Sequence, residues 1–486
     1  MGGLKMTVMA FPFALGACAT TLPTGITAPG AGFALVASKT HEATGRRSVW
    51  LQSSAQAQQV AGEIHALVHR KTITADTAVQ VALLNNRGLQ ASYAAIGISA
   101  AEVWQQATPE NPVVSVGLLG IGAPELGLFR ALESVIAVNL LDAPTRQRRV
   151  AVAQADFQRA QMQAVLDTLA LANATRTAWI DAVAAFETVA LLNRAAQSAD
   201  ASSELAFQLG RTGALNRAAQ AREQVFDAEL AAQTAEARLA AASAKEQLTR
   251  LMGLWGTEVD YFVPDALPAL PGSLRSTAGL EVRALQNRVD LEVARLSLAA
   301  TAAAYGLTDA TRTLTDLEVI AGAELERERE DGNSEEEVTP QIELEFAIPI
   351  YDSGKARLRK AELSYLQAAN VLAEAAVNVR SEARSAETQY RGTYAIARQY
   401  RDVVLPLRRI IDEESLLANN GMITSTFELL ADVREGLGSQ LDAAEAKHQF
   451  WRAAAGLDAA IYGGAGAAGG GDGGGVELAA GGGAGH

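Results

Sequence analysis

Few residues of this 486-residue chain occur in patterns that could do metal or nucleophilic chemistry. His65 and His69 in IHALVHR are spaced so that a helix would carry both on one face, which is a spacing used for zinc. No glutamate follows His65 as in the H-E-x-x-H motif, and no third ligand is evident. The sequence also lacks a glycine-rich phosphate loop and a G-x-S-x-G nucleophile motif. We therefore expect no enzyme activity, no cofactor and no metal site.

Cys18 is the only cysteine, so it can form neither an internal disulfide nor a zinc site made of several cysteines. A lysine, a short apolar run and two small residues precede it, as in a secretory signal peptide. The run is too short to span a bilayer as a helix, which takes about 20 residues. These features predict a signal peptide over residues 1–17.

Leu15-Gly16-Ala17-Cys18 resembles the bacterial lipobox, which implies that Cys18 is acylated and becomes the lipid-anchored N-terminus. Ala19 follows in place of the aspartate that favours retention at the inner membrane, so the resemblance implies sorting to the outer membrane. A free cysteine in an ordinary signal peptide is the alternative interpretation.

Each half of the chain contains a pair of strand-like segments, and the second pair alternates with the period of a β-strand. Segment 342–350 places large apolar side chains on one face and glutamates on the other, and segment 317–325 repeats this pattern. The acidic residues are Glu318, Glu324, Glu343 and Glu345. About nine alternating residues can cross a bilayer when tilted, which is typical of outer-membrane strands, although a half-exposed soluble sheet has the same period.

Composition and charge limit the class of protein. Alanine is abundant and aromatic residues make up only 5% of the chain, so long, closely packed helices are favoured over a thick aromatic core. The net charge of −14 argues against nucleic acid as a partner, because phosphate binding needs a concentrated basic surface. No apolar stretch is long enough for a transmembrane helix.

The sequence is duplicated, with a first repeat at 74–255 and a second at 279–459. Each repeat is expected to contain a short helical segment, two strands and a helical hairpin. The strands are predicted at 113–121, 133–141, 317–325 and 342–350, and the hairpins at 145–252 and 355–459. Residues 18–73 form an N-terminal segment, residues 256–278 are a proline-bearing linker, and the glycine-rich tail 460–486 is expected to be disordered.

The hairpins contain unusually long helices. Residues 145–208 include no proline or glycine, so an unbroken helix there would be about 96 Å long. The counterpart 355–419 is interrupted only by Gly392 and Pro406. Such lengths predict a coiled-coil-like assembly. Gly210, Gly213 and Gly421 are expected to supply the positive φ that ends a helix.

The lipobox, the duplicated strand and helix hairpins, and the segments NPVVSVGLLG and FAIPIYDSGKARLRKAE together resemble the outer membrane factor (TolC-like) family of efflux proteins. The resemblance covers about residues 70–460. Its most specific motif is the strand-to-helix junction, here Tyr351 to Arg357 with Asp352 and Gly354. The first junction, LLDAPTR, keeps the acid as Asp142 but lacks the glycines.

This resemblance implies a mostly α-helical fold with a small transmembrane β part, in a homotrimer at the outer membrane. Each chain would give four strands to one β-barrel, and the hairpins would form an α-barrel across the periplasm. Four strands alone leave two unpaired edges, which a bilayer does not tolerate, and trimerisation removes them. The function implied is passive efflux, with a periplasmic adaptor and an inner-membrane transporter as partners.

The resemblance also implies roles for particular residues. The four strand glutamates would line the pore as acidic rings that favour cations, or would supply only general polarity. The turns between the long helices would lie at the periplasmic tip and contact the adaptor. The tip residues are Gly210, Arg211, Gly213, Asn216, Asn420, Gly421, Thr424 and Ser425. Segment 324–337 is expected to be an exposed, solvated loop.

A periplasmic coiled-coil adaptor or scaffold lipoprotein is the alternative function. Its strands would form a soluble domain, and its hairpin would dock on the channel of another protein. Such an adaptor would usually carry one hairpin, so the duplication favours the channel. The sequence does not identify an exported substrate.

Overall fold

A computed structural model describes residues 25–119, 121, 131–211, 216–312, 317–330, 333–420 and 426–464. The chain divides into two compact units. The sheet unit comprises residues 1–31, 97–158 and 296–369, and the helical unit comprises residues 32–96, 159–295 and 370–486. Both sequence repeats contribute to both units, so the compact units are not the repeats themselves.

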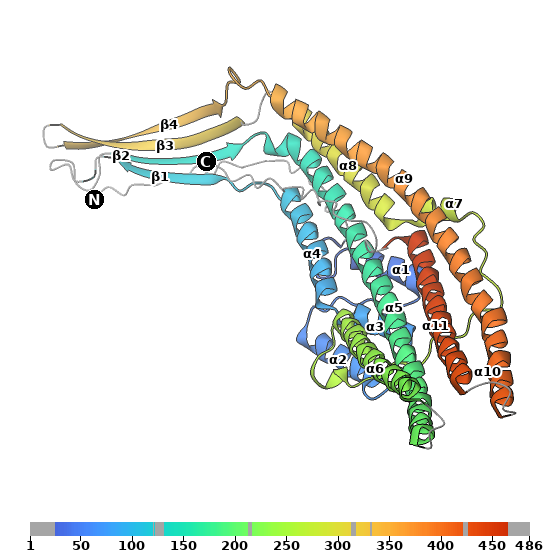
Figure 1. The fold of residues 1–486 in the computed structure, drawn as a ribbon. Helices are drawn as coiled ribbons and strands as arrows, with labels where there is room; N and C mark the ends of the chain where they lie inside the picture. Colours follow the sequence, from blue (N-terminus) through green and yellow to red (C-terminus); the bar gives the residue numbers. More distant parts are fainter. Residues whose placement is uncertain are drawn as a thin grey trace. The chain divides into compact units, whose positions relative to one another are not determined.

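The sheet unit contains four antiparallel strands in the order β1-β2-β3-β4 (Figure 1). The strands are β1 (Val113–Leu119), β2 (Ala131–Asn139), β3 (Leu317–Glu330) and β4 (Asn333–Phe346). The two strands of each repeat are neighbours, and β2 pairs with β3 to join the repeats into one sheet. β1 and β4 are therefore the edges of this sheet.

Strands β3 and β4 are longer than predicted, and the expectation of a loop over 324–337 is wrong for most of that segment. The ladder between the strands continues to the pair Glu330 and Asn333, which leaves only Asp331 and Gly332 between them. At its other end β4 stops at Phe346, short of the predicted 350. Pro349 follows, and because proline has no N–H it cannot continue a ladder.

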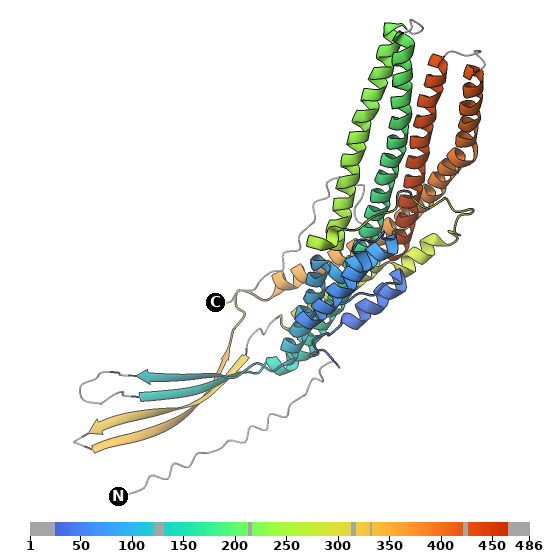
Figure 2. The same cartoon turned by 90° about the horizontal axis from the view of Figure 1, so that it is seen from below.

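The long helices form two hairpins, seen as pairs of helices in Figure 2. The first pair is α5 (Asp142–Arg211), with 70 residues, and α6 (Arg217–Met252). The second consists of α9 (Lys355–Gln399), a π-helical turn η2 (Tyr400–Val404), α10 (Leu405–Asn420) and α11 (Thr426–Tyr462). The predicted unbroken helix over 145–208 is confirmed. Gly392 does not interrupt α9, and η2 ends two residues before Pro406, which lies in the first turn of α10.

Each repeat begins with two short helices separated by one residue. These helices are α3 (Ala75–Asn85) and α4 (Arg87–Ala107), then α7 (Leu280–Asn287) and α8 (Val289–Ala310). At the first break the Asn86 side chain accepts a hydrogen bond from the Leu89 N–H at 3.0 Å, which caps α4. At the second break the buried Arg288 forms ion pairs with Asp290 and Glu382, and its guanidinium lies 2.6 Å from the Glu382 carboxylate.

The segments outside the repeats are partly helical. The N-terminal segment contains α1 (Phe33–Thr44) and α2 (Ser54–Val68), and the linker contains the short helix η1 (Gly256–Val259). The expectation of disorder from residue 460 is wrong for 460–462, which lie in α11. Residues 465–486 lie outside the described part of the chain.

The core of the helical unit forms around the long helices. One cluster packs α2, α3 and α5 together, and there the Trp179 indole N–H donates to the carbonyl of Ile73 at 3.0 Å. A second cluster packs α7, α9 and α11 through Tyr390, Tyr394 and Phe450. Within the described residues, no helix combines the length and the hydropathy that crossing a bilayer would need.

Candidate functional site

The strand register places the four predicted glutamates on one face of the sheet. Glu318 is directly opposite Glu345, Glu343 is opposite Ile320, and Glu324 is opposite Thr339. Directly opposed residues of antiparallel strands point to the same side, and alternate residues share a face. Glu133 of β2, opposite Glu324, belongs to the same face and was missed by the sequence analysis. We call this surface the acidic face.

A hydrogen bond on the acidic face spans three strands. The Gln341 amide of β4 donates to the Glu133 carboxylate of β2 at 2.9 Å. Gly322 of β3 lies between them in the register, opposite both Val135 and Gln341. Since glycine has no side chain, Gln341 can reach across β3. A Cβ at this position would overlap the Ser134 carbonyl and the Val135 side chain.

The opposite side of the sheet, the apolar face, carries large exposed hydrophobic side chains. Leu344 is 58% exposed and pairs with Val319, and Val116 of β1 is 65% exposed. Other exposed members of this face are Val114, Leu118, Ile136, Val338, Ile342 and Phe346. Soluble monomers rarely leave so large a contiguous apolar surface uncovered. The sheet therefore needs an apolar environment on one side and a polar one on the other.

The first strand-to-helix junction is held by charged side chains. Asp142, in the first turn of α5, is buried and is ion-paired with both Arg146 and Arg149. Burial alone would raise the pKa of Asp142, but the hydrogen bonds from the two arginines outweigh it and hold that pKa below its ordinary value. Arg149 also lies 3.7 Å from Glu110, just after α4. This ion pair thus connects the first turns of α5 to the segment that follows α4.

The second junction is held by backbone geometry. Gly354 has φ +72°, in the left-handed region that favours glycine, and its N–H donates to the Asp352 carboxylate at 2.8 Å. A Cβ on Gly354 would overlap the carbonyl oxygen of Arg312, beyond the end of α8. Here the chain reaches the preceding helix by close backbone approach, whereas the first junction uses side chains.

The described tip residues lie where the helices end. Arg211 is the last residue of α5, Asn216 directly precedes α6, and Asn420 is the last residue of α10. Gly210 lies inside α5 without a positive φ, so its predicted role in ending the helix is wrong. Gln220 lies so close to Gly210 that a Cβ there would overlap its amide. Four tip residues and the lipid-anchor residue lie outside the described parts of the chain, namely Gly213, Gly421, Thr424, Ser425 and Cys18.

The two histidines of IHALVHR stack on each other, with ring centroids 4.4 Å apart. In the described parts of the chain, no group of three or more histidine, cysteine or acidic side chains is placed to hold a metal ion. His65 lies in the last turn of α2 and His69 directly follows the helix, so the two rings form a stacked pair at its C-terminal end.

Ionic contacts join α11 to the first hairpin. Lys447 contacts Glu187 of α5 at 2.5 Å, and Arg434 contacts Glu223 of α6 at 2.8 Å. His448 has one ring nitrogen 2.8 Å from Asp181 of α5. Burial alone would lower the pKa of His448, but hydrogen bonds to Asp181 and Glu445 raise it overall. Charged pairs thus connect α11 of the second hairpin to both helices of the first.

Comparison with known proteins gives structural matches only. Models of known protein families do not match the sequence, and no similar curated protein is found. Among solved structures, CusC, studied for its transmembrane channel formation, matches with a TM-score of 0.65 and 17% identity over 80% of this chain and 91% of its own. The CmeC outer membrane channel of Campylobacter jejuni matches with a TM-score of 0.63 and 16% identity, over 80% of this chain and 86% of its own.

The outer membrane protein VceC of Vibrio cholerae gives a TM-score of 0.60 and 14% identity, over 85% of this chain and 99% of its own length. Agreement at such low identity concerns the path of the backbone, and it extends over nearly the whole of each matched protein. The chain therefore has the fold of these outer-membrane channel proteins.

Proposed function

We propose that this protein is the outer-membrane channel of a tripartite efflux system. In this proposal it forms a homotrimer, conducts substrates passively across the periplasm and outer membrane, and is anchored by lipid at Cys18. A periplasmic adaptor at the helix tips and an inner-membrane transporter would be its partners. The observation that carries the proposal is the four-stranded sheet with one apolar face, one acidic face and two unpaired edges.

The unpaired edges give the physical reason for assembly. In the part of the chain that the structure describes, β1 and β4 each have a strand on one side only, so each leaves a row of backbone N–H and C=O groups without a ladder partner. In hydrocarbon every such group costs several kcal/mol, on the order of 2–7 by transfer measurements. Pairing β4 of one copy with β1 of the next satisfies both rows. Three copies give a closed barrel with the apolar face outward and the acidic face inward.

The acidic face supports conduction of cations or neutral molecules. Glu318 and Glu345 are directly opposed in the register, and like charges in that position destabilise a sheet unless water or counterions screen them. A water-filled lumen supplies that screening. Repetition of the face in three copies would place carboxylates around the pore, where they raise the local concentration of cations.

The experiment is a measurement of assembly and conductance on the purified full chain. We expect a trimer on a gel that dissociates on heating, and discrete single-channel currents in a planar bilayer with cations more permeant than anions. A monomer that carbonate releases from membranes, without channel activity, would contradict the proposal. That result would favour the adaptor or scaffold alternative.

Two adjacent residues of β4 provide a matched pair of variants. Leu344→Arg places a charge on the apolar face, where an arginine costs about 2–4 kcal/mol at the bilayer midplane, so we expect loss of the trimer and of current. Glu343→Arg places the same side chain on the acidic face, and we expect the trimer to persist with its preference shifted toward anions. If both variants lose assembly equally, the assignment of the two faces is wrong.

A further inference from the structure

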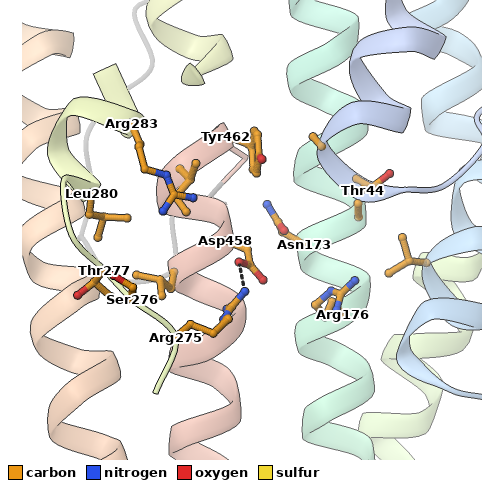
Figure 3. Close-up of a pocket in the computed structure, with 15 residues that line it drawn as sticks. Thr44, Asn173, Arg176, Arg275, Ser276, Thr277, Leu280, Arg283, Asp458 and Tyr462 are labelled. Carbon is orange, nitrogen blue, oxygen red and sulfur yellow. Dashed lines mark hydrogen bonds and ion pairs between the residues drawn. The ribbon is translucent and has the colours of Figure 1, made fainter. Parts of the chain in front are cut away.

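A cavity of about 330 Å³ lies within the helical unit, apart from the sheet and the helix tips (Figure 3). Its walls come from the end of α1, the middle of α5, the segment that precedes α7, the start of α7, and the end of α11. At about 30 Å³ per water molecule, this space is enough for about ten non-hydrogen atoms. The cavity is thus the size of a small organic molecule.

Arginines dominate the charge of this cavity. Arg176, Arg275 and Arg283 line it, together with one carboxylate, Asp458. Asp458 pairs with Arg275 at 3.0 Å, as the dashed line in Figure 3 shows, and Arg176 pairs outside the lining with Asp76 at 3.1 Å. Within the described residues, no carboxylate lies within ion-pair distance of Arg283. A cationic lining is unusual in a chain whose net charge is −14.

Neutral polar side chains complete the lining. Asn173, on α5, and Tyr462, at the end of α11, line the same space (Figure 3), and the Asn173 amide nitrogen donates to the carbonyls of Gly463 and Gly464 at 3.2 and 3.3 Å. Thr277 also lines the cavity, and its hydroxyl is held by Glu387 and Arg391, each at 2.6 Å. These residues come from segments far apart in the sequence and fix the shape of the wall.

The start of α7 adds little to the positive charge of the cavity. Its N-cap is Gly279, and Leu280, the first residue of the helix, lines the cavity. The Leu280 N–H already donates to the carbonyl of Thr277 at 3.1 Å, and Glu281 places a carboxylate in the same turn. The arginines, rather than the helix end, therefore favour an anionic ligand.

We propose that this cavity binds a small organic anion through its phosphate or carboxylate group. Arg283 and Arg275 would contact the oxyanion, because guanidinium groups donate two parallel hydrogen bonds to phosphate or carboxylate oxygens. The Tyr462 hydroxyl would hydrogen-bond the rest of the molecule, and the side-chain oxygen of Asn173 would accept from a hydroxyl group, because its amide nitrogen is already bonded to two backbone carbonyls. Asp458 would orient Arg275 while weakening the overall attraction for anions. This site is independent of the channel surfaces proposed above.

Calorimetric titration of the purified full chain tests the site at constant ionic strength. The probes are inorganic phosphate, glycerol 3-phosphate and citrate, with sodium chloride as the reference salt. We expect saturable binding of one anion per chain. Glycerol 3-phosphate, with about ten non-hydrogen atoms, should bind more tightly than inorganic phosphate because it fills the cavity. If citrate binds more tightly than glycerol 3-phosphate, the site is specific for carboxylates rather than phosphates. Absence of saturable binding by all three probes would overturn the proposal.

Three variants separate this site from general surface charge. Arg283→Gln should weaken anion binding at least tenfold. Asp458→Asn should strengthen it, a gain that misfolding cannot produce. The control Arg359→Gln removes an exposed arginine that pairs with Glu362 outside the cavity, and it should leave binding unchanged. Equal loss in Arg283→Gln and Arg359→Gln, or no gain in Asp458→Asn, would overturn the proposal.

Discussion

The two strand-to-helix junctions occupy equivalent positions in the two repeats but are stabilised by different chemistry. In the first, the buried Asp142 is paired with Arg146 and Arg149. In the second, Gly354 takes a positive φ and packs against the carbonyl of Arg312, and Asp352 is mostly exposed. One turn of the chain can thus be fixed either by a buried charge cluster or by a backbone conformation. The difference predicts that the junctions will respond differently to substitution and to pH.

Removing the carboxylate of the first junction should have the largest effect. Asp142→Ala leaves two partly buried arginines without their anion, and loss of one partner of a buried ion pair costs about 3–5 kcal/mol in the free energy of unfolding. Thermal and denaturant unfolding followed by circular dichroism in detergent measures this. The matched control is Asp352→Ala in the second junction, where the exposed carboxylate is 3.5 Å from Arg357 and the cost should stay below about 1 kcal/mol. Equal costs at both positions would remove the distinction between the junctions.

Substitution of the junction glycine should have an intermediate effect. Gly354→Ala forces a side chain into the left-handed region and against the Arg312 carbonyl, which should cost about 1–3 kcal/mol of unfolding free energy. The control is Gly392→Ala inside α9, where an added Cβ meets nothing within 4 Å. That change should stabilise the protein by up to about 1 kcal/mol, because alanine favours a helix over glycine. A neutral Gly354→Ala would show that backbone conformation does not hold this junction.

Acidification should have the smallest effect on stability. Of the two junctions, only the first should respond to it. Because the folded-state pKa of Asp142 is lowered, its contribution is present above the unfolded value of about 3.9 and is lost as the pH falls through the folded value. We expect the difference in melting temperature between the native chain and Asp142→Asn to stay constant from pH 7 to about pH 5 and to narrow as the pH falls below about 4. A difference that stays constant down to about pH 2 would contradict the assigned ion pairs.

The long helices could be predicted from the sequence because their signal is local. Residues 145–208 contain no residue that breaks a helix, and α5 spans them without interruption. The alternation in 317–325 and 342–346 likewise predicted the two faces of the sheet, since a strict period of two fixes which side each residue occupies. Gly392 and Pro406 predicted interruptions less reliably. One glycine costs a helix interior only about 1 kcal/mol, and α9 continues through Gly392. The π-helical turn η2 lies just before Pro406, and α10 continues the helix after it.

The ends of β3 and β4 could not be predicted from charge alone, because the charges of 324–337 are typical of a solvated loop. A stronger signal was available in Asp331-Gly332, since an Asp-Gly pair between alternating segments favours a two-residue hairpin. The arginine partners of Asp142 could also have been found, because spacings of four and seven residues share one helix face. The cavity could not, since Thr44, Arg176 and Asp458 meet only in the folded chain.

The π-helical turn η2 determines how α10 meets α11. A turn of this kind adds one residue to the helical circuit, and each residue rotates whatever follows by about 100° around the axis. Beyond this turn, Arg408 meets Glu435 at 2.7 Å and Ser415 hydrogen-bonds Asp432. The number of residues between Gln399 and Leu405 thus determines which side of α10 faces α11. A single-residue deletion there would leave the helix straight while swinging its contacts away from their partners.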